Sequence, residues 1–468
     1  MNVLLITIDS LRADRVGNST GLTPEMDAIA DEGIDCNQAV THGHGTPVAF
    51  PSILTGTYPM LHGGCSVLSP RRPILARRLK NAGYDTVAFT SNPHLFDKYG
   101  YSVGFDNFNE YQGDTNESTG THSILERTRL SVSSVFGQES LIYDYLRPIY
   151  YFLLAATDER PYAPADEVNE QFFSWLDNRN SSAPFFSCIH YMDTHYPFYQ
   201  KDDRLAEINA DPIPMRTQRR VNRLMNESPE ALTHKETETL RTLYDAETRF
   251  TDEQLGLLFE NLRERDLWEE TLVIITSDHG EALGEHGAFG HYKALYEELF
   301  RVPLIFRIPS VSSHRIEEQV GLVEIAPTVL DYVGEPINMD HDGSFSGTSL
   351  RRLIEGNNDG NDKDSNEWPG HKHVIGHGDP LGVRTERWKY VWWDRNGNKP
   401  LEVELFDLHA DPKETTDVSD DYPEIVTMFD NYLEAHIAHS EATDHEPDAA
   451  SYDANSEIES QLEALGYR

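Results

Sequence analysis

Five short, nearly continuous apolar runs recur along this chain, with room for a helix between successive runs. The first covers residues 2–8 (Asn-Val-Leu-Leu-Ile-Thr-Ile), and the others cover 85–90, 184–190, 271–276 and 302–308. Runs of this kind are typical of parallel strands that are buried on both faces. Helical patterns lie at 71–82, 165–178, 237–263 and 321–333. Strands that alternate with helices predict an α/β fold with a doubly wound, mostly parallel sheet.

The main α/β domain is predicted over residues 1–354, because all five apolar runs fall within this range. Two stretches, about 111–165 and 200–235, interrupt the strand–helix alternation and are predicted to be insertions above the sheet. Segment 355–371 is rich in Gly, Asn and Asp, a composition that is typical of a polar surface linker.

A second, smaller unit is expected after this linker. Its strand patterns lie at 372–377, 381–395 and 401–407, and a helical pattern follows at 422–437. Several short strands in succession favour antiparallel pairing, so a small C-terminal α+β subdomain is predicted over 372–440. The remaining residues, 441–468, read as an acidic tail with a short terminal helix.

The charge balance is strongly acidic, with 79 Asp and Glu residues against 39 Lys and Arg and a formal net charge of -40. Only 10 of the basic residues are Lys. An acidic surface repels nucleic acid and anionic membranes, so neither is expected as a partner. Because the charge is spread over the whole chain, we interpret it as adaptation to concentrated salt, as in haloarchaeal proteins; a specific cationic partner is the alternative.

Cysteine usage and hydropathy bear on the compartment. Cys36, Cys65 and Cys188 show neither a metal-binding spacing nor an even disulfide set, and they read as buried thiols in a reducing compartment. No basic segment precedes the first apolar run, and charged residues interrupt the apolar segment 138–156, which reads as a buried or lid helix. The sequence therefore predicts a cytoplasmic protein without a membrane span.

Polar, chemically capable residues follow several of the predicted strands. Asp9 comes directly after the first strand, Asp278-His279 comes after the fourth, and a histidine-rich stretch, 190–195, ends the third. The carboxyl ends of parallel strands meet at one edge of the sheet, where functional groups gather. Asp9 taken alone is as consistent with a helix cap or turn as with a metal ligand. Asp278 and His279 are both capable of binding a metal.

Several motifs occur in an order that resembles the sulfatase family of the alkaline-phosphatase superfamily. They are Asp9-Ser10-Leu11-Arg12, Pro51-Ser52-Ile53-Leu54-Thr55-Gly56, His190-Tyr191-Met192-Asp193-Thr194-His195, Ser277-Asp278-His279-Gly280-Glu281, Arg301-Val302-Pro303 and Glu404-Leu405-Phe406-Asp407-Leu408. The resemblance covers nearly the whole chain outside the two insertions. It implies an alkaline-phosphatase-like α/β core, one divalent metal ion and a nucleophile at the start of a helix.

The resemblance also assigns roles by position. Asp9, Asp278 and His279 correspond to metal ligands, and Thr46 falls at the nucleophile position, where its oxygen is a further ligand. Carboxylates with one imidazole suit Ca²⁺, Mg²⁺ or Mn²⁺. Such an ion lowers the pKa of a bound hydroxyl group and screens the charge of an anionic substrate.

The chain departs from the family at the nucleophile. Sulfatases proper have Cys or Ser in a Cys-x-Pro-x-Arg setting and oxidise it to formylglycine, whereas this chain has Thr46, Val48 and Phe50. Formylglycine is therefore not expected. A threonine ester cannot eliminate sulfate, so water must attack the sulfur or phosphorus of the intermediate. The superfamily resemblance thereby favours phosphorus esters. The alternative for Thr46 is a helix cap near a metal that only binds substrate.

Further residues carry expected roles from the same resemblance. His195 would protonate the leaving oxygen or hold the transferred group. His291 and Lys293 both lie where the family places a cation against the anion, and the spacing does not choose between them. The family's Gly-Lys-Trp-His element is replaced by Ser91-Asn92-Pro93-His94, which removes one expected cation, and Ser10 stands where many relatives have Asp.

The sequence therefore predicts a metal-dependent hydrolase of sulfate esters, or of related phosphodiesters or phosphonate esters, that uses Thr46. Small-molecule or glycan esters are the expected substrates, and the oligomeric state is left open. Two alternatives stand beside this prediction. One is a transferase that moves a phospho-group to a glycan; the other is a degenerate sulfatase-like binding protein.

Overall fold

A computed structural model describes the chain apart from residues 66, 112–161, 338–344, 357–371, 397–398 and 444–468. An eight-stranded sheet runs in the order β10-β2-β9-β6-β1-β5-β3-β4. Its strands are β1 Asn2–Ile8, β2 Ile34–Val40, β3 Asp85–Thr90, β4 Asn107–Glu110, β5 Phe185–Tyr191, β6 Thr271–Ser277, β9 Leu304–Arg307 and β10 His314–Gly321. All neighbours pair in parallel except β9, which is antiparallel to β2 and β6. The predicted doubly wound, mostly parallel sheet is confirmed.

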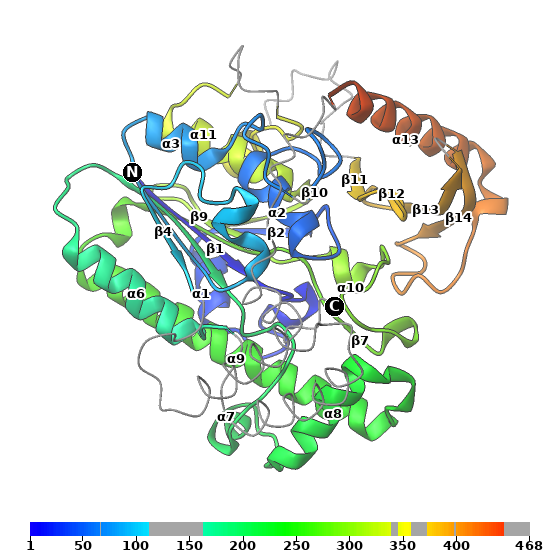
Figure 1. Cartoon of the computed structure of the whole chain (residues 1–468), viewed down its shortest axis with the longest axis horizontal. Helices are drawn as coiled ribbons and strands as arrows, with labels where there is room; N and C mark the ends of the chain where they lie inside the picture. The colour runs from blue at the N-terminus through cyan, green and yellow to red at the C-terminus, as the bar shows by residue number, and fades with distance from the viewer. Residues whose placement is uncertain (66, 112–161, 338–344, 357–371, 397–398, 444–468) are drawn as a thin grey trace, which may run out of the picture.

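The central strand β1 explains how helices come to cover both faces of the sheet (Figure 1). Its residues are all buried and alternate between two apolar clusters, as the pleat of a strand requires. Leu5 packs on the face that α2, α3 and α11 cover, and Leu4 packs on the face that α1, α6 and α9 cover. These helices are α1 Pro24–Glu32, α2 Thr46–Thr55, α3 Leu75–Asn81, α6 Ala165–Asn178, α9 His234–Glu264 and α11 Ile325–Val333.

The described part of the 200–235 insertion forms two helices that lean on α9. These are α7 Asp202–Glu207 and α8 Met215–Glu227, and Leu205, Val221 and Leu243 share one apolar cluster. A short hairpin of β7 Ala282–Leu283 and β8 Phe289–Gly290 leads to α10 Glu297–Phe300. Most of the 111–165 insertion, including segment 138–156, lies outside the described residues.

The small C-terminal unit is a four-stranded antiparallel sheet, as predicted. It contains β11 His373–Gly376, β12 Leu381–Arg384, β13 Trp388–Asn396 and β14 Lys399–Asp407. The prediction of one strand over 381–395 is wrong, because a turn at 385–387, in which Thr385 accepts from the Trp388 amide, divides it into β12 and β13. Helix α13, Pro423–Thr443, packs Phe429, Leu433 and Ile437 on this sheet. The short helix α12, Arg351–Ile354, precedes the 355–371 segment, most of which is not described.

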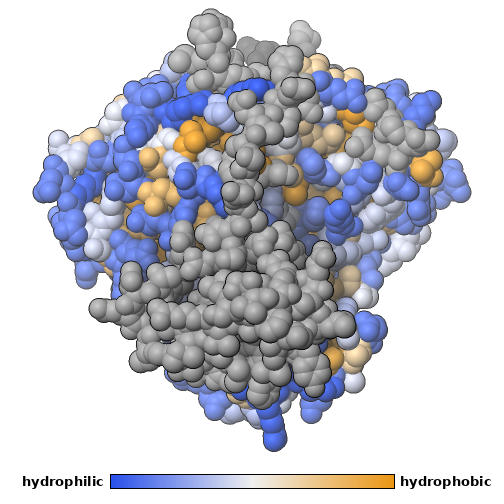
Figure 2. All heavy atoms as spheres, viewed as in Figure 1, coloured by the Kyte–Doolittle hydropathy of each residue, from blue (hydrophilic) through white to orange (hydrophobic). Residues whose placement is uncertain are grey.

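The described surface in Figure 2 is mainly hydrophilic, with hydrophobic residues scattered singly or in small groups. Among the helices that the structure describes, none is both long enough and apolar enough to cross a membrane. All three cysteines are buried and free, and burial raises the pKa of each thiol.

Candidate active site and metal centre

Strand ends and one helix start bring the predicted metal ligands together. Asp9 follows β1, Asp278 and His279 follow β6, and Thr46 is the first residue of α2. All four are fully buried. One ligand atom from each of Asp9, Asp278 and His279 lies within 4.8 Å of the other two. The β1–β6 register, Ile8 opposite Ser277, places the two aspartates side by side at the carboxyl edge.

Thr46 points its hydroxyl group into this cluster. Its Oγ1 donates to Asp9 Oδ2 at 3.1 Å and lies 3.4 Å from His279 Nε2. Gly45 occupies the N-cap of α2, and no side chain caps the helix. The Thr46 hydroxyl therefore contacts the acidic cluster, in addition to lying at the positive end of the helix dipole.

The chemistry of these donors fits a divalent cation. His279 Nδ1 lies 2.8 Å from the Gly280 carbonyl, which only accepts, so Nδ1 carries the proton and Nε2 presents a lone pair. That lone pair lies 3.7 Å from Asp9 Oδ1 and 3.5 Å from Asp278 Oδ2. Asp278 Oδ2 is buried and has no hydrogen-bond partner among the described residues. A buried acceptor without a donor is satisfied when a cation binds between these groups.

The two carboxylates have opposite pKa shifts. For Asp9, burial raises the pKa, but the neighbouring His195, His190 and His279 outweigh burial and hold it well below its usual range. Burial, and then the Asp9 charge, raise the pKa of Asp278 to about 7. Two carboxylates this close in a dry site do not both ionise easily without a cation.

Three neighbouring residues hold Asp9 in place. Asn92 Nδ2 donates to Asp9 Oδ2 at 2.9 Å and to Thr46 Oγ1 at 3.2 Å. His190 Nε2 lies 3.1 Å from Asp9 Oδ2, and Ser10 Oγ donates to Asp9 Oδ1 at 2.9 Å. From the sequence, Asn92 was interpreted only as the loss of a cation and His190 as a structural residue. Asn92 follows a predicted strand and His190 ends one, so the expectation that functional groups gather at the carboxyl ends of strands could have indicated both residues.

The two other predicted histidines, His195 and His291, are close to each other, and His291 is also close to His279. The His291 ring is 5.1 Å from the His195 ring and 4.9 Å from the His279 ring, centre to centre. Burial lowers the pKa of His195 to about 4, although the Asp9 charge opposes burial. Burial also acts to lower the pKa of His291, but the carboxylate of Glu281, 3.7 Å away, raises it overall.

Lys293 is exposed, whereas Asp9, Thr46, Asp278, His279 and His195 are fully buried. The charge of Lys293 nevertheless acts on His44. Burial lowers the pKa of His44 to about 4, and His291, His279 and Lys293 contribute in the same direction. Of the two predicted cations, the structure brings His291 to the cluster.

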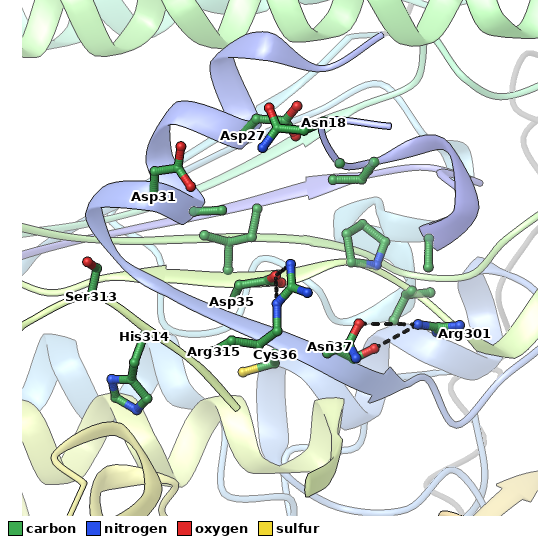
Figure 3. A pocket seen from close by; sticks show the side chains of 17 residues that line it. Asn18, Asp27, Asp31, Asp35, Cys36, Asn37, Arg301, Ser313, His314 and Arg315 are labelled. Carbon is green, nitrogen blue, oxygen red and sulfur yellow. Dashed lines mark hydrogen bonds and ion pairs between the residues drawn. The ribbon is translucent and has the colours of Figure 1, made fainter. Parts of the chain in front are cut away.

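A separate cavity of about 340 Å³ lies beside α1, β2 and β9 (Figure 3). None of the four predicted metal and nucleophile residues lines it. Its charged groups largely pair with polar neighbours: Arg315 is 2.7 Å from Asp35, and Arg301 donates to the Asn37 carbonyl at 3.0 Å. This cavity therefore does not belong to the site described above.

An α/β sheet that brings two carboxylates, an imidazole and a helix-terminal hydroxyl group together at one edge has the donors that a metal-dependent hydrolase needs. A family model described as Sulfatase matches residues 1–335, and the chain therefore belongs to the sulfatase family, as predicted. A model described as N-sulphoglucosamine sulphohydrolase, C-terminal, matches residues 284–439. This family groups the chain with hydrolases of ester bonds.

Individual relatives agree with this family. Arylsulfatase K of Canis lupus familiaris is 34% identical over 212 residues, which span 44% of this chain and only 38% of that relative. An arylsulfatase of Clostridium perfringens is 25% identical and is covered over 93% of its length by 92% of this chain. The crystal structure of phosphonate monoester hydrolase of Agrobacterium radiobacter shares the fold, with a TM-score of 0.64 at 21% identity, over 94% of this chain and 96% of that one.

Proposed function

We propose that this chain hydrolyses sulfate esters, or the related phosphonate monoesters and phosphodiesters, with Thr46 as the nucleophile. The observation that carries the proposal is the position of Thr46 Oγ1, 3.1 Å from Asp9 Oδ2 and 3.4 Å from His279 Nε2, at the start of α2. A hydroxyl group beside two metal-capable side chains supports a role for Thr46 as a nucleophile.

Asp9, Asp278 and His279 would hold one Ca²⁺, Mg²⁺ or Mn²⁺ ion, with Thr46 Oγ1 adjoining it. When bound, the ion supplies Lewis-acid stabilisation of the substrate's negative charge and lowers the pKa of the threonine hydroxyl group. Asn92 fixes the orientation of Thr46, since its amide donates to both Thr46 Oγ1 and Asp9 Oδ2. The Thr46 proton is directed to the Asp9 carboxylate in the described arrangement.

The reaction proceeds in two displacements. Thr46 Oγ1 forms a bond to the sulfur or phosphorus atom as the ester bond to the leaving oxygen breaks, and that oxygen takes up a proton. Water then attacks the same sulfur or phosphorus atom, which breaks its bond to Thr46 and releases the free anion. The rings of His291 and His195 lie 5.1 Å apart, with His291 4.9 Å from His279, and these two histidines are the groups proposed to deliver and accept these protons.

The nucleophile favours phosphorus and the family name favours sulfur, so the substrate choice is left to experiment. The printed names of the relatives include both arylsulfatases and a phosphonate monoester hydrolase. The acidic excess of 79 against 39 residues supports assay in concentrated salt.

The test compares Thr46→Ala and Thr46→Ser with wild type on an aryl sulfate, an aryl phosphonate monoester and an aryl phosphodiester. Thr55→Ala, the same change at the other end of α2, is the matched control. We expect Thr46→Ala to lose at least about 10³-fold in kcat with metal still bound, and Thr46→Ser to retain part of it. Mass spectrometry of a slow substrate should place the sulfuryl or phosphonyl group on Thr46. Wild-type turnover by Thr46→Ala would exclude the threonine mechanism.

A further inference from the structure

A second cluster of metal-capable side chains lies where the catalytic domain meets the C-terminal sheet. One ligand atom from each of His286, Glu298 and Glu414 lies within 4.8 Å of the other two. The residues come from three places: the turn between β7 and β8, helix α10, and the segment after β14. In Figure 1, α10 stands between the main domain and the C-terminal strands. This cluster shares no residue with the site of Asp9, Asp278 and His279.

The backbone holds two of these residues in unusual conformations. His286 has a φ of 51° and Glu414 a φ of 53°, in the left-handed region that non-glycine residues rarely adopt. The His286 ring stacks on Tyr296, with 3.7 Å between ring centres and 4° between planes. Its Nε2 lies 4.0 Å from Glu298 Oε2. The imidazole is therefore fixed with one ring nitrogen turned towards the carboxylate.

Glu298 supplies the observation that points to a ligand. Its side chain is only 7% exposed, and its buried Oε1 has no hydrogen-bond partner among the described residues. A desolvated carboxylate oxygen without a donor is costly, and natural proteins satisfy such atoms with a proton, a water molecule or a cation. Glu298 therefore offers a ligand its buried Oε1, which accepts no hydrogen bond from a described residue, in addition to Oε2, which faces His286.

Of the three neighbouring carboxylates, Glu298 is the one that has no Lys or Arg within ion-pair distance among the described residues, although the charge of Lys389 also acts on it. Glu297 is paired twice, with Arg384 at 2.8 Å and Lys389 at 2.8 Å. Lys389 also pairs with Glu414, at 2.7 Å. Three carboxylates therefore share two fixed positive charges. Burial raises the pKa of Glu298, and it raises that of Glu414 to about 7, as expected where a negative charge is left without a cation. The charge of Glu285 adds to the negative potential at Glu298.

We infer that His286, Glu298 and Glu414 form a second site for a divalent transition-metal cation such as Mn²⁺ or Zn²⁺, separate from the catalytic metal. One imidazole with two carboxylates is a donor set that Mn²⁺ and Zn²⁺ both accept. Ligand atoms around an ion at about 2.1 Å lie about 3.0–3.4 Å from one another, so these atoms, which lie within 4.8 Å of one another, would move up to about 1.5 Å closer together on binding.

The site has a structural role. It joins α10 and the β7–β8 turn of the catalytic domain to Glu414 of the C-terminal unit. Helix α10 also contacts the metal-binding turn of the first site, because the Gly280 amide donates to the Leu299 carbonyl at 2.8 Å. A cation bound here would therefore fasten the two units together and support the Asp278-His279 turn from behind.

The test counts bound metal in the full chain. The protein is stripped with EDTA, reloaded with Mn²⁺, desalted and analysed by inductively coupled plasma mass spectrometry. We expect about two Mn²⁺ per chain for wild type, about one for Glu298→Gln, about one for Asp278→Asn, and none for the double variant. Glu402→Gln, at an exposed position of β14, is the matched control and should match wild type. Unfolding in urea is a second readout: Mn²⁺ should stabilise Asp278→Asn but not the double variant.

His286→Asn is a second test of the same site, in case Glu298→Gln does not fold because Glu298 is buried. Asn tolerates the left-handed backbone at this position and removes the imidazole, so this variant should also bind about one Mn²⁺. The inference is overturned if Asp278→Asn alone abolishes all Mn²⁺ binding, or if Glu298→Gln and His286→Asn bind as much as wild type. Either result would mean that this cluster does not bind a metal ion. Because the count does not use turnover, it fails or succeeds independently of the proposed ester hydrolysis.

Discussion

Acid should loosen the contact between the two units through a single buried histidine, His42. Its Nδ1 donates to the Val374 carbonyl at 2.8 Å, and its own carbonyl accepts from the Gly376 amide at 3.0 Å. His42 thereby binds β11 with both side chain and backbone. Its Nε2 is buried without a hydrogen-bond partner among the described residues, and the ring of His373 lies 5.3 Å away. A proton on His42 would find no acceptor there.

The magnitude follows from the pKa of His42. Burial lowers that pKa from 6.5 to about 4, so the unfolded chain binds a proton more readily than the folded chain. The contribution to stability is therefore fully present above about pH 6.5 and is lost as the pH falls towards 4. The whole difference corresponds to at most about 3 kcal/mol, of which about 2 kcal/mol is lost between pH 7 and pH 5.

The assay is urea unfolding at pH 7 and pH 5, at fixed high salt, for wild type and His42→Asn. Asn keeps a donor near the Nδ1 position but cannot take up a proton in this range. We expect the free energy of unfolding of wild type to fall by about 2 kcal/mol more than that of His42→Asn over this interval. The exposed His409, changed to Asn, is the control and should follow wild type. Equal pH dependence in wild type and His42→Asn would refute the reasoning.

Three other perturbations test the surroundings of the site. Asn92→Ala removes the donor to Asp9 and should lower kcat by about 10- to 100-fold with metal content retained; unchanged turnover would contradict its positioning role. Arg72→Met should cost about 3 kcal/mol in urea unfolding, because the buried guanidinium donates to the Pro59 and Gly64 carbonyls; a loss below about 1 kcal/mol would contradict this. Gly280→Ala would place a Cβ 2.0 Å from the Glu298 carbonyl oxygen and should prevent stable folding, whereas a wild-type melting temperature would contradict that close contact.

The strands that the sequence revealed are those buried on both faces. β1, β5 and β6 are buried at every residue, so each appears as an apolar run. β10, β2 and β4 were missed. β10 and β4 lie at the two edges of the sheet, and β2 and β10 interleave polar or exposed residues, as in Ile-Asp-Cys-Asn-Gln and His-Arg-Ile-Glu-Glu. Nor does an apolar run report direction, which is why the antiparallel β9 was not foreseen.

At the candidate site, the sequence identified the metal-capable residues at the strand ends. It did not identify the residues that orient them through hydrogen bonds or charge. The strand-end rule together with family motifs named Asp9, Asp278 and His279, whose ligand atoms the structure brings together. Asn92 also follows a predicted strand, but its role as a donor to Asp9 was missed because that role depends on where its amide points in space. Glu281, buried beside His291, was missed for the same reason.

The composition of the site connects its departures from the family to its proposed chemistry. Where relatives place a cationic element and a second Asp, this chain has Asn92 and Ser10, which hold Asp9 as neutral donors. Burial holds the pKa of His94 and His195 at about 4, so neither is a cation at neutral pH. Under the proposed function, positive charge for the ester anion therefore comes from the metal ion and from His291. A site with so few fixed charges depends on its metal, so metal removal should abolish substrate binding as well as turnover. Retained binding of sulfate to metal-free protein, measured by calorimetry, would contradict this dependence.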